Sequence, residues 1–187
     1  RETGRRCLYI PNVTADGPAT LERAIFARRA GAGAVIVSGG LTGLSMLRSV
    51  ATSAEVGLPV FFHPAFSGSY VVGPSPAFTE RAFFGQVLRL ACADAVIFPS
   101  FGGRFSFSRK QCVGILSGCR MPMSGLKPMF PAPGGGLNFS NISDSMGFYG
   151  NDVIFLIGGG LFRHSRDITL SVRDLMALVE SGASPKP

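Results

Sequence analysis

Two neighbouring stretches of the chain share one pattern: FPAPGGGLNFS, from Phe130 to Ser140, and IFLIGGGLFRH, from Ile154 to His164. Each is an apolar run followed by three glycines and then by more polar residues. A turn alone requires one or two glycines, at the positions where φ is positive. Three in a row, after two neighbouring apolar runs, indicate that another group approaches the backbone closely. The alternative is that the glycines serve tight turns and close packing of the following helices.

Six short apolar runs are predicted to be buried parallel strands. They are continuous rather than alternating, as strands covered on both faces are. Helical patterns separate them, and the runs recur every 29 residues on average, counted from Cys7 to Asp152. The six runs are Cys7–Asn12, Ala34–Ser38, Pro59–His63, Ala95–Ser100, Lys127–Ala132 and Asp152–Ile157.

This strand–helix order predicts an α/β fold of the (β/α)8 TIM-barrel type. Eight such units take about 250 residues, so the 187 residues of this chain are expected to supply six units, with the N-terminal part of the barrel missing. Residues 1–187 would then be one truncated barrel domain of a longer protein. A doubly wound open sheet is the alternative, but the first strand–helix turn lacks a G-x-G-x-x-G sequence.

The charge balance favours an anionic partner. The chain has 18 Lys and Arg against 11 Asp and Glu, and only Lys110, Lys127 and Lys186 are lysines. Arginine suits bidentate binding of carboxylate or phosphate. The arginines are scattered and form no basic helix, so a nucleic-acid partner is not expected. The alternative is that the acidic complement lies elsewhere in a longer protein.

The cysteines and the lengths of the apolar runs limit the kinds of metal site and cellular location that are expected. The four cysteines form no C-x-x-C pair and the two histidines lie far apart, so no zinc site is predicted. Free thiols indicate a reducing, cytoplasmic location. No apolar run reaches the roughly 18 residues of a membrane span, and no signal peptide opens the chain, so no membrane partner is expected.

Residues at the carboxyl ends of the predicted strands are the candidate site, because the active face of such a barrel lies there. Bare glycine backbone lets an oxygen-rich anion reach N–H groups, so the two triplets predict a phosphate site. The predicted phosphate-binding residues are Gly134, Gly135, Gly136, Gly158, Gly159 and Gly160.

Four further side chains are candidates for substrate chemistry. His63 ends the third run and is predicted to act as a general acid–base or hydrogen-bond donor; a structural histidine is the alternative. Arg104 follows two glycines and is predicted to close over the substrate, the alternative being a solvated loop arginine. Asn12 and His164 are candidate substrate contacts. No carboxylate pair sits on adjacent strand ends, so no metal ligand is predicted within this chain.

Five stretches, in order, resemble the large subunit of ribulose bisphosphate carboxylase (RuBisCO), and more closely its non-carboxylating relatives, the form IV RuBisCO-like proteins. The resemblance implies a (β/α)8 barrel behind a smaller N-terminal domain, a homodimer with sites at its interface, and a phosphorylated substrate. It also implies Mg²⁺, held by a carbamylated lysine and two acidic residues that lie outside this chain. The stretches are LERAIFARRAG with GGLTG, VFFHPAFSGSY, GQVLRLACADAVIFPS before GGR, FPAPGGG, and GNDVIFLIGGG before RH.

Departures from the family pattern argue against carboxylation of ribulose bisphosphate. In the resemblance, His63 matches the first residue of a His-Arg motif whose arginine is replaced here. That arginine is Pro64 here. Ser67 stands in place of a second histidine, Ile97 in place of a histidine on the next strand, and Arg104 in place of a mobile-loop lysine. Gly134 stands in place of a serine before the first glycine pair.

The resemblance implies a lyase or isomerase. Its substrate would be a phosphorylated keto-sugar or keto-acid, and a Mg²⁺-stabilised enolate would lead to enolisation, isomerisation, or decarboxylation and carboxyl transfer. The stretches GGRFSFS and PAPGGG favour the branch of sugar-acid breakdown over that of methionine salvage. One alternative is a non-catalytic fragment or scaffold that binds an anion, and another is an unrelated phosphate-binding barrel or nucleotide-binding sheet.

Overall fold

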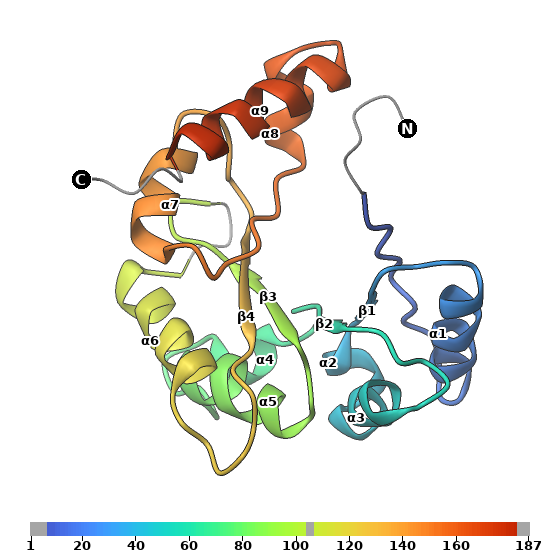
Figure 1. Cartoon of the computed structure of the whole chain (residues 1–187). Coiled ribbons are helices and arrows are strands. Elements are labelled where there is room, and N and C mark those ends of the chain that lie inside the picture. The colour runs from blue at the N-terminus through green and yellow to red at the C-terminus, as the bar shows by residue number, and fades with distance from the viewer. Residues whose placement is uncertain (1–6, 104–106, 183–187) are drawn as a thin grey trace.

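A sheet of four parallel strands lies at the centre of the molecule (Figure 1). The computed structural model describes residues 7–103 and 107–182. The strands are neighbours in chain order: β1 (Val35–Val37), β2 (Val60–Phe62), β3 (Ala95–Pro99) and β4 (Phe130–Gly134). All three pairings are parallel. The predicted α/β class with a parallel sheet is therefore confirmed.

The predicted count of six strands is not confirmed. The apolar runs before β1 and after β4 lie beside the sheet, but each makes a single parallel bridge to it. Asn12 bridges to Ile36 at one edge, and Leu156 bridges to Gly134 at the other. The described residues therefore contain four strands with a bridged segment at either edge, and the closed barrel stays a prediction.

Prolines explain why the two edge runs are not full strands. Ile36 N–H donates to the Pro11 carbonyl at 2.9 Å, and Leu156 N–H donates to the Pro133 carbonyl at 3.1 Å. Ile154 N–H donates in the same way to the carbonyl of Pro131, at 3.0 Å. At both edges the proline carbonyls accept hydrogen bonds, but a proline has no N–H to donate. Part of the hydrogen bonding that would make a continuous strand is therefore missing.

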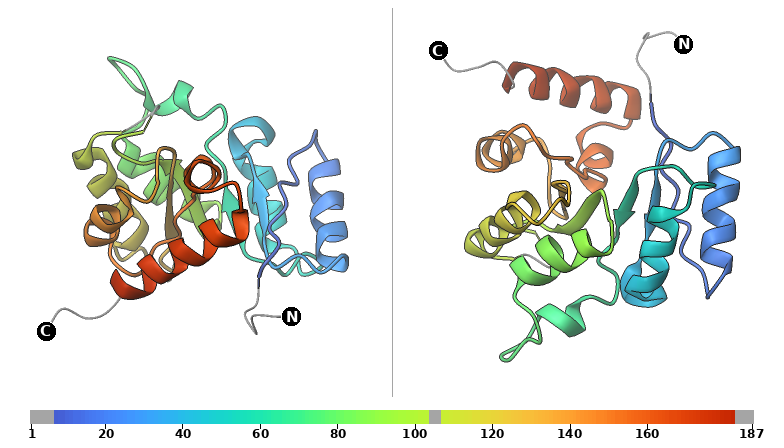
Figure 2. Two further views of the ribbon diagram at one scale, coloured as in Figure 1. Left: turned by 90° about the horizontal axis from the view of Figure 1, so that it is seen from above. Right: turned by 60° about the horizontal axis from the view of Figure 1, so that its bottom comes forward.

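Helices follow the strands and form an arc around the outside of the sheet (Figures 1 and 2). Contacts join α1 to β1, α3 to β2, η1 to β3 and α6 to β4. The helices are α1 (Ala19–Arg29), α2 (Gly39–Thr42), α3 (Leu44–Thr52), α4 (Gly68–Val71), the π-helix η1 (Arg81–Val87), α5 (Leu88–Leu90), α6 (Arg109–Arg120), α7 (Ile142–Tyr149), α8 (Gly159–His164) and α9 (Ile168–Gly182). Among the described residues, none of the helices combines the length and apolar character that crossing a membrane requires.

Local sequence explains some of the helix boundaries. Ser108 caps α6, because its side chain accepts a hydrogen bond from Gln111 N–H while the Gln111 side chain accepts one from Ser108 N–H. This reciprocal capping box satisfies two backbone donors that the first turn leaves free. Gly43, with φ of 83°, separates α2 from α3. Most L-residues avoid that conformation, so the chain turns there.

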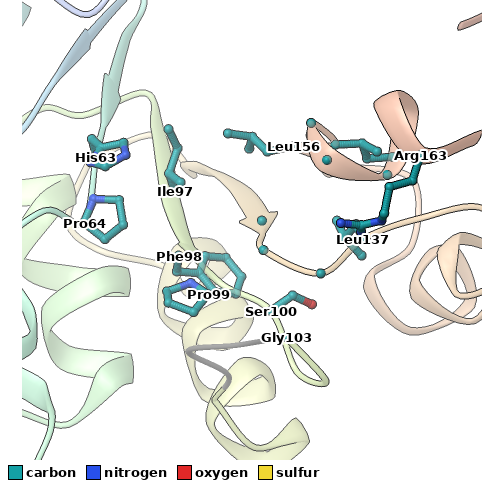
Figure 3. Close-up of a pocket in the computed structure, with 17 residues that line it drawn as sticks. His63, Pro64, Ile97, Phe98, Pro99, Ser100, Gly103, Leu137, Leu156 and Arg163 are labelled. Carbon is teal, nitrogen blue, oxygen red and sulfur yellow. The ribbon is translucent and has the colours of Figure 1, made fainter. Parts of the chain in front are cut away.

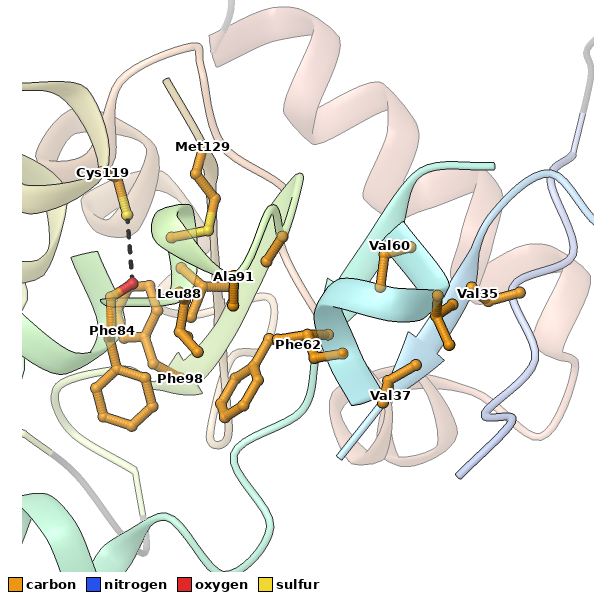
Figure 4. Close-up of a cluster of buried hydrophobic side chains, with 14 of the residues drawn as sticks. Val35, Val37, Val60, Phe62, Phe84, Leu88, Ala91, Phe98, Cys119 and Met129 are labelled. Atoms are coloured by element: carbon orange, nitrogen blue, oxygen red, sulfur yellow. Dashed lines mark hydrogen bonds between the residues drawn. The ribbon is translucent and has the colours of Figure 1, made fainter. Parts of the chain in front are cut away.

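Alternate strand residues build two apolar clusters, one on each face of the sheet. Val60 and Phe62 point toward the helices and belong to the larger cluster (Figure 4). Phe61 and Ile97 belong to a smaller cluster on the opposite face. Leu156 packs against that second cluster, which leads to the cavity at the carboxyl ends of the strands.

Candidate functional site

A cavity of about 840 Å³ lies at the carboxyl ends of the strands (Figure 3). His63 and Pro64 follow β2, and Ser100 follows β3. The loop after β4 and the segment that opens α8 complete the wall with both glycine triplets. The glycines that line the cavity are Gly103, Gly134, Gly135, Gly136, Gly158, Gly159 and Gly160. Parallel strands in chain order place these distant residues at one edge of the sheet.

Several of the glycines are required because loop backbones pack against each other. A Cβ on Gly103 would lie 2.4 Å from the Gly135 carbonyl oxygen, and one on Gly136 would lie 2.8 Å from Gly103 Cα. A Cβ on Gly160 would lie 2.6 Å from the Leu137 carbonyl oxygen. The close approach suggested by the sequence therefore includes contacts between the three loops themselves.

Other glycines of the triplets leave backbone donors free. No described residue accepts a hydrogen bond from the N–H of Gly135, Gly136 or Gly158. A Cβ on Gly135 or Gly158 would meet no heavy atom within 4 Å. All three residues are exposed at the cavity, so their N–H groups face solvent there. These N–H groups therefore remain available to an anion in the cavity.

His63 lies across the cavity from Leu156 and Arg163, which come before and after the second triplet in the chain (Figure 3). Its Nδ1 accepts a hydrogen bond from Ala65 N–H at 3.2 Å. Burial lowers the pKa of His63 below its ordinary value of 6.5. The ring is therefore neutral at pH 7, and with Nδ1 as acceptor its proton is on Nε2.

A buried polar pair behind the cavity is missed by sequence reasoning. Ser100 Oγ lies 3.0 Å from the Tyr149 hydroxyl, and both residues are buried. Burial, with a hydrogen bond to Cys112, raises the pKa of the Tyr149 phenol, which therefore stays protonated. The pair ties α7 to the end of β3. No pattern in the sequence joins two residues 49 positions apart.

The remaining predicted contacts do not line this cavity. The Asn12 side chain accepts hydrogen bonds from Thr14, at 3.0 Å from its N–H and 2.6 Å from its hydroxyl. His164 Nε2 lies 2.8 Å from Asp174 Oδ2, and its ring stacks on Phe139. The cavity wall instead includes Arg163, the residue before His164.

Arg104, the predicted loop cation, lies outside the described residues.

Three curated relatives and a solved structure resemble the chain. Ribulose bisphosphate carboxylase-like protein 1 of Rhodopseudomonas palustris is 33% identical over 89% of this chain and 43% of its own length. The 2,3-diketo-5-methylthiopentyl-1-phosphate enolase of Bacillus cytotoxicus is 32% identical, over 86% and 39%. The 5-methylthioribulose-1-phosphate isomerase of Rhodospirillum rubrum is 30% identical, over 98% and 47%. A rubisco-like protein from Alicyclobacillus acidocaldarius aligns with a TM-score of 0.87 at 31% identity, over 97% and 46%. The chain belongs to the RuBisCO-like family.

This RuBisCO-like chain spans less than half the length of the curated relatives named above. No protein-family model matches it. Two of the relatives are named as enzymes, an enolase and an isomerase, which act on phosphorylated five-carbon sugars or diketones that carry a methylthio group.

Magnesium, which the family resemblance implies, does not fit the described residues. They contain no group of three His, Cys, Asp or Glu side chains placed to hold a metal ion. The described part of the cavity lining includes His63 and Arg163 but no carboxylate. Mg²⁺ in proteins is bound mainly through carboxylate and water oxygens. Its ligands would have to come from outside the described residues.

Proposed function

We propose that this RuBisCO-like chain carries the phosphate-binding part of an enzyme site that enolises or isomerises a phosphorylated keto-sugar. The observation that supports this most is the set of free N–H groups on Gly135, Gly136 and Gly158, which share one cavity with His63. The names of the relatives favour a methylthio-pentulose phosphate or its diketone over the sugar-acid substrates predicted from the sequence. Carboxylation of ribulose bisphosphate is not part of the proposal.

In the proposed reaction His63 donates a hydrogen bond to the substrate carbonyl oxygen. Its Nε2–H is the donor left after Nδ1 accepts from Ala65. A neutral donor placed where negative charge develops stabilises the enolate more than it stabilises the ketone. The phosphate, held on the glycine loops, fixes the position of that carbonyl.

Two further elements of the proposal come from the family resemblance. Arg104 would close over the bound substrate, and a homodimer would complete the site. Decarboxylation or carboxyl transfer on a phosphorylated keto-acid would use the same phosphate and carbonyl contacts.

Phosphorylated ligands are expected to stabilise the protein. At about 100 times its dissociation constant, a ligand adds about 2.7 kcal/mol, which raises Tm by about 5–10 °C for a chain of this size. A thermal melt with and without 5-methylthioribulose 1-phosphate measures the shift. Gly158→Val should abolish it, since the new side chain has room but enters the cavity beside the free N–H.

The matched control is Gly147→Ala in α7, which also meets no neighbour and lies outside the cavity. It should keep the full shift. A folded wild-type protein whose Tm does not move with any phosphorylated sugar would show that the triplets serve only loop packing.

Substitution of His63 is expected to affect turnover more than binding. In the intact enzyme, His63→Ala should lower kcat about 100-fold with little change in KM, as for loss of one positioned donor. His63→Gln should lose about tenfold, because its amide N–H can occupy the place of Nε2. Exchange of the substrate's α-hydrogen with D₂O, followed by NMR, measures the rate. Unchanged exchange in His63→Ala would remove the residue from the mechanism.

The pH profile provides a second readout of the same group. Because burial lowers the pKa of His63, the ring is neutral at pH 7 and becomes protonated only below pH 6.5. Protonation puts a second N–H on Nδ1, against the Ala65 N–H from which it now accepts, and so disturbs the placement of the ring. Wild-type activity should therefore change only on the acidic side of pH 6.5, and this limb should be absent in His63→Gln.

A non-catalytic anion-binding module is the second candidate. It is favoured by the absence of any carboxylate from the cavity wall among the described residues. Stabilisation by phosphorylated sugars, without hydrogen exchange in the intact protein, would support this candidate over the enzyme.

A further inference from the structure

The Arg163 side chain extends from α8 toward Leu137, the residue after the first glycine triplet (Figure 3). A Cβ on Gly159 would lie 3.3 Å from Arg163 Nη1, so the guanidinium lies directly above that glycine. The same side chain lines the cavity that contains His63. An arginine therefore faces the free backbone donors of the glycine loops.

The guanidinium of Arg163 has no partner of its own among the described residues. No carboxylate of the described ranges lies within 4.0 Å of it, and no carbonyl there accepts its hydrogen bonds. Other arginines of the chain are engaged: Arg109 pairs with Asp144, and Arg120 donates to the Tyr149 carbonyl at 3.1 Å. Among residues 7–103 and 107–182, the cavity lining also includes no acidic residue that would neutralise the charge.

We propose that Arg163 binds the dianionic phosphate ester of the substrate, together with the free N–H groups of Gly135, Gly136 and Gly158. This inference rests on the proposed function, and it assigns to Arg163 the selection of a phosphate ester over the corresponding alcohol. A planar guanidinium donates two parallel hydrogen bonds to two phosphate oxygens, whereas an ammonium group acts as a point charge. The backbone donors occupy the remaining oxygens.

Calorimetric titration of the intact protein tests the assignment. The probes are inorganic phosphate, 5-methylthioribulose 1-phosphate and unphosphorylated 5-methylthioribulose. Arg163→Gln should weaken binding of the ester about 10- to 100-fold, the usual size for charged hydrogen bonds. The affinity of Arg163→Lys for the ester should lie between those of the wild type and Arg163→Gln. The affinity for the unphosphorylated sugar should not change in either variant.

Arg166→Gln is the matched control, because Arg166 is exposed nearby and does not line the cavity. It should change the affinity for the ester less than about twofold, the scale of a surface charge. Thermal melts of all variants should coincide with the wild type, since Arg163 is exposed and makes no hydrogen bond to another described residue.

The outcomes separate this inference from the proposed function. If the wild type binds the ester and Arg163→Gln binds it equally well, the glycine backbone alone holds the phosphate and the role of Arg163 is overturned. If Arg163→Gln weakens inorganic phosphate only, and the wild type does not bind the ester, the site takes free phosphate. If neither probe binds the folded wild type, the proposed function fails as well.

Discussion

Replacing Arg89 with methionine should lower the free energy of unfolding by about 4 kcal/mol, because four backbone carbonyls would lose a charged donor. Arg89 is 3% exposed. Its guanidinium donates to the carbonyls of Lys127 at 3.0 Å, Gly118 at 3.1 Å, Met121 at 2.7 Å and Leu126 at 2.9 Å. A methionine fills similar volume but satisfies none of them. Urea denaturation measures the loss, and Tm should fall by about 8–16 °C.

The charge of Arg89 is compensated by dipoles rather than by an ion. Among the described residues no carboxylate pairs with it. Gly118 lies in the last turn of α6 and Met121 follows that helix, and the carbonyls at a helix C-terminus carry partial negative charge. Arg89→Lys should therefore keep the charge but lose the planar guanidinium that donates to several carbonyls at once. Its free energy of unfolding should lie between those of the wild type and Arg89→Met.

Arg48 offers the matched control for this prediction. It also donates to a carbonyl near a helix end, that of Leu90 at 2.7 Å, but the residue is exposed. Arg48→Met should cost less than about 1 kcal/mol, since water can replace the lost donor. Equal losses in Arg48→Met and Arg89→Met would contradict the argument that burial makes the difference.

The arginine excess is one place where the sequence alone is ambiguous. Composition favours an anionic partner for the arginines as a group. In the structure, Arg89 binds carbonyls, Arg109 packs over Phe101 with 4.1 Å to the ring centroid, and Arg163 lines the cavity. The contacts of each arginine depend on which helix ends and aromatic rings the fold places beside it. Neither the number of charges nor their spacing in the sequence predicts these contacts.

The strands β1, β2 and β3 lie within one residue of their predicted bounds, whereas β4 is displaced and the two edge runs form only single bridges. The sequence places β4 at Lys127–Ala132, but the strand runs from Phe130 to Gly134. The Lys127 carbonyl is taken by the Arg89 side chain, and Pro128 has no N–H, so the ladder begins later. The pattern of apolar residues predicts which segments are buried, but it does not show where a single backbone N–H donor is missing.

The candidate site is predictable at the level of strand ends. Parallel strands in chain order bring their carboxyl ends together, so the sequence alone predicts that His63 and both triplets lie near one another, as they do around the cavity. The direction of a single side chain is less accessible. Successive residues of a helix differ by about 100°, so where α8 begins decides that Arg163, and not His164, lines the cavity.

Gly118→Ala should destabilise the protein by about 2 kcal/mol, although alanine is the better helix former. The helices α6 and η1 touch through their glycines. A Cβ on Gly118 would lie 2.6 Å from the Arg81 carbonyl oxygen and 2.8 Å from Gly85 Cα, and both obstacles are backbone. The helices must separate to admit one methyl group, which loosens the packing behind β3 and β4.

Gly114, one turn earlier on α6, provides the control that separates packing from propensity. Its added Cβ would lie 3.5 Å from Arg81 Cβ, an ordinary contact. Gly114→Ala should therefore stabilise the protein by about 0.5–1 kcal/mol through lower chain entropy in the unfolded state. Two substitutions of the same kind on one helix are thus expected to have opposite signs in urea denaturation. If both stabilised the protein, the close approach of Gly118 to Gly85 would not be a constraint on the fold, because the two helices would have room to spare.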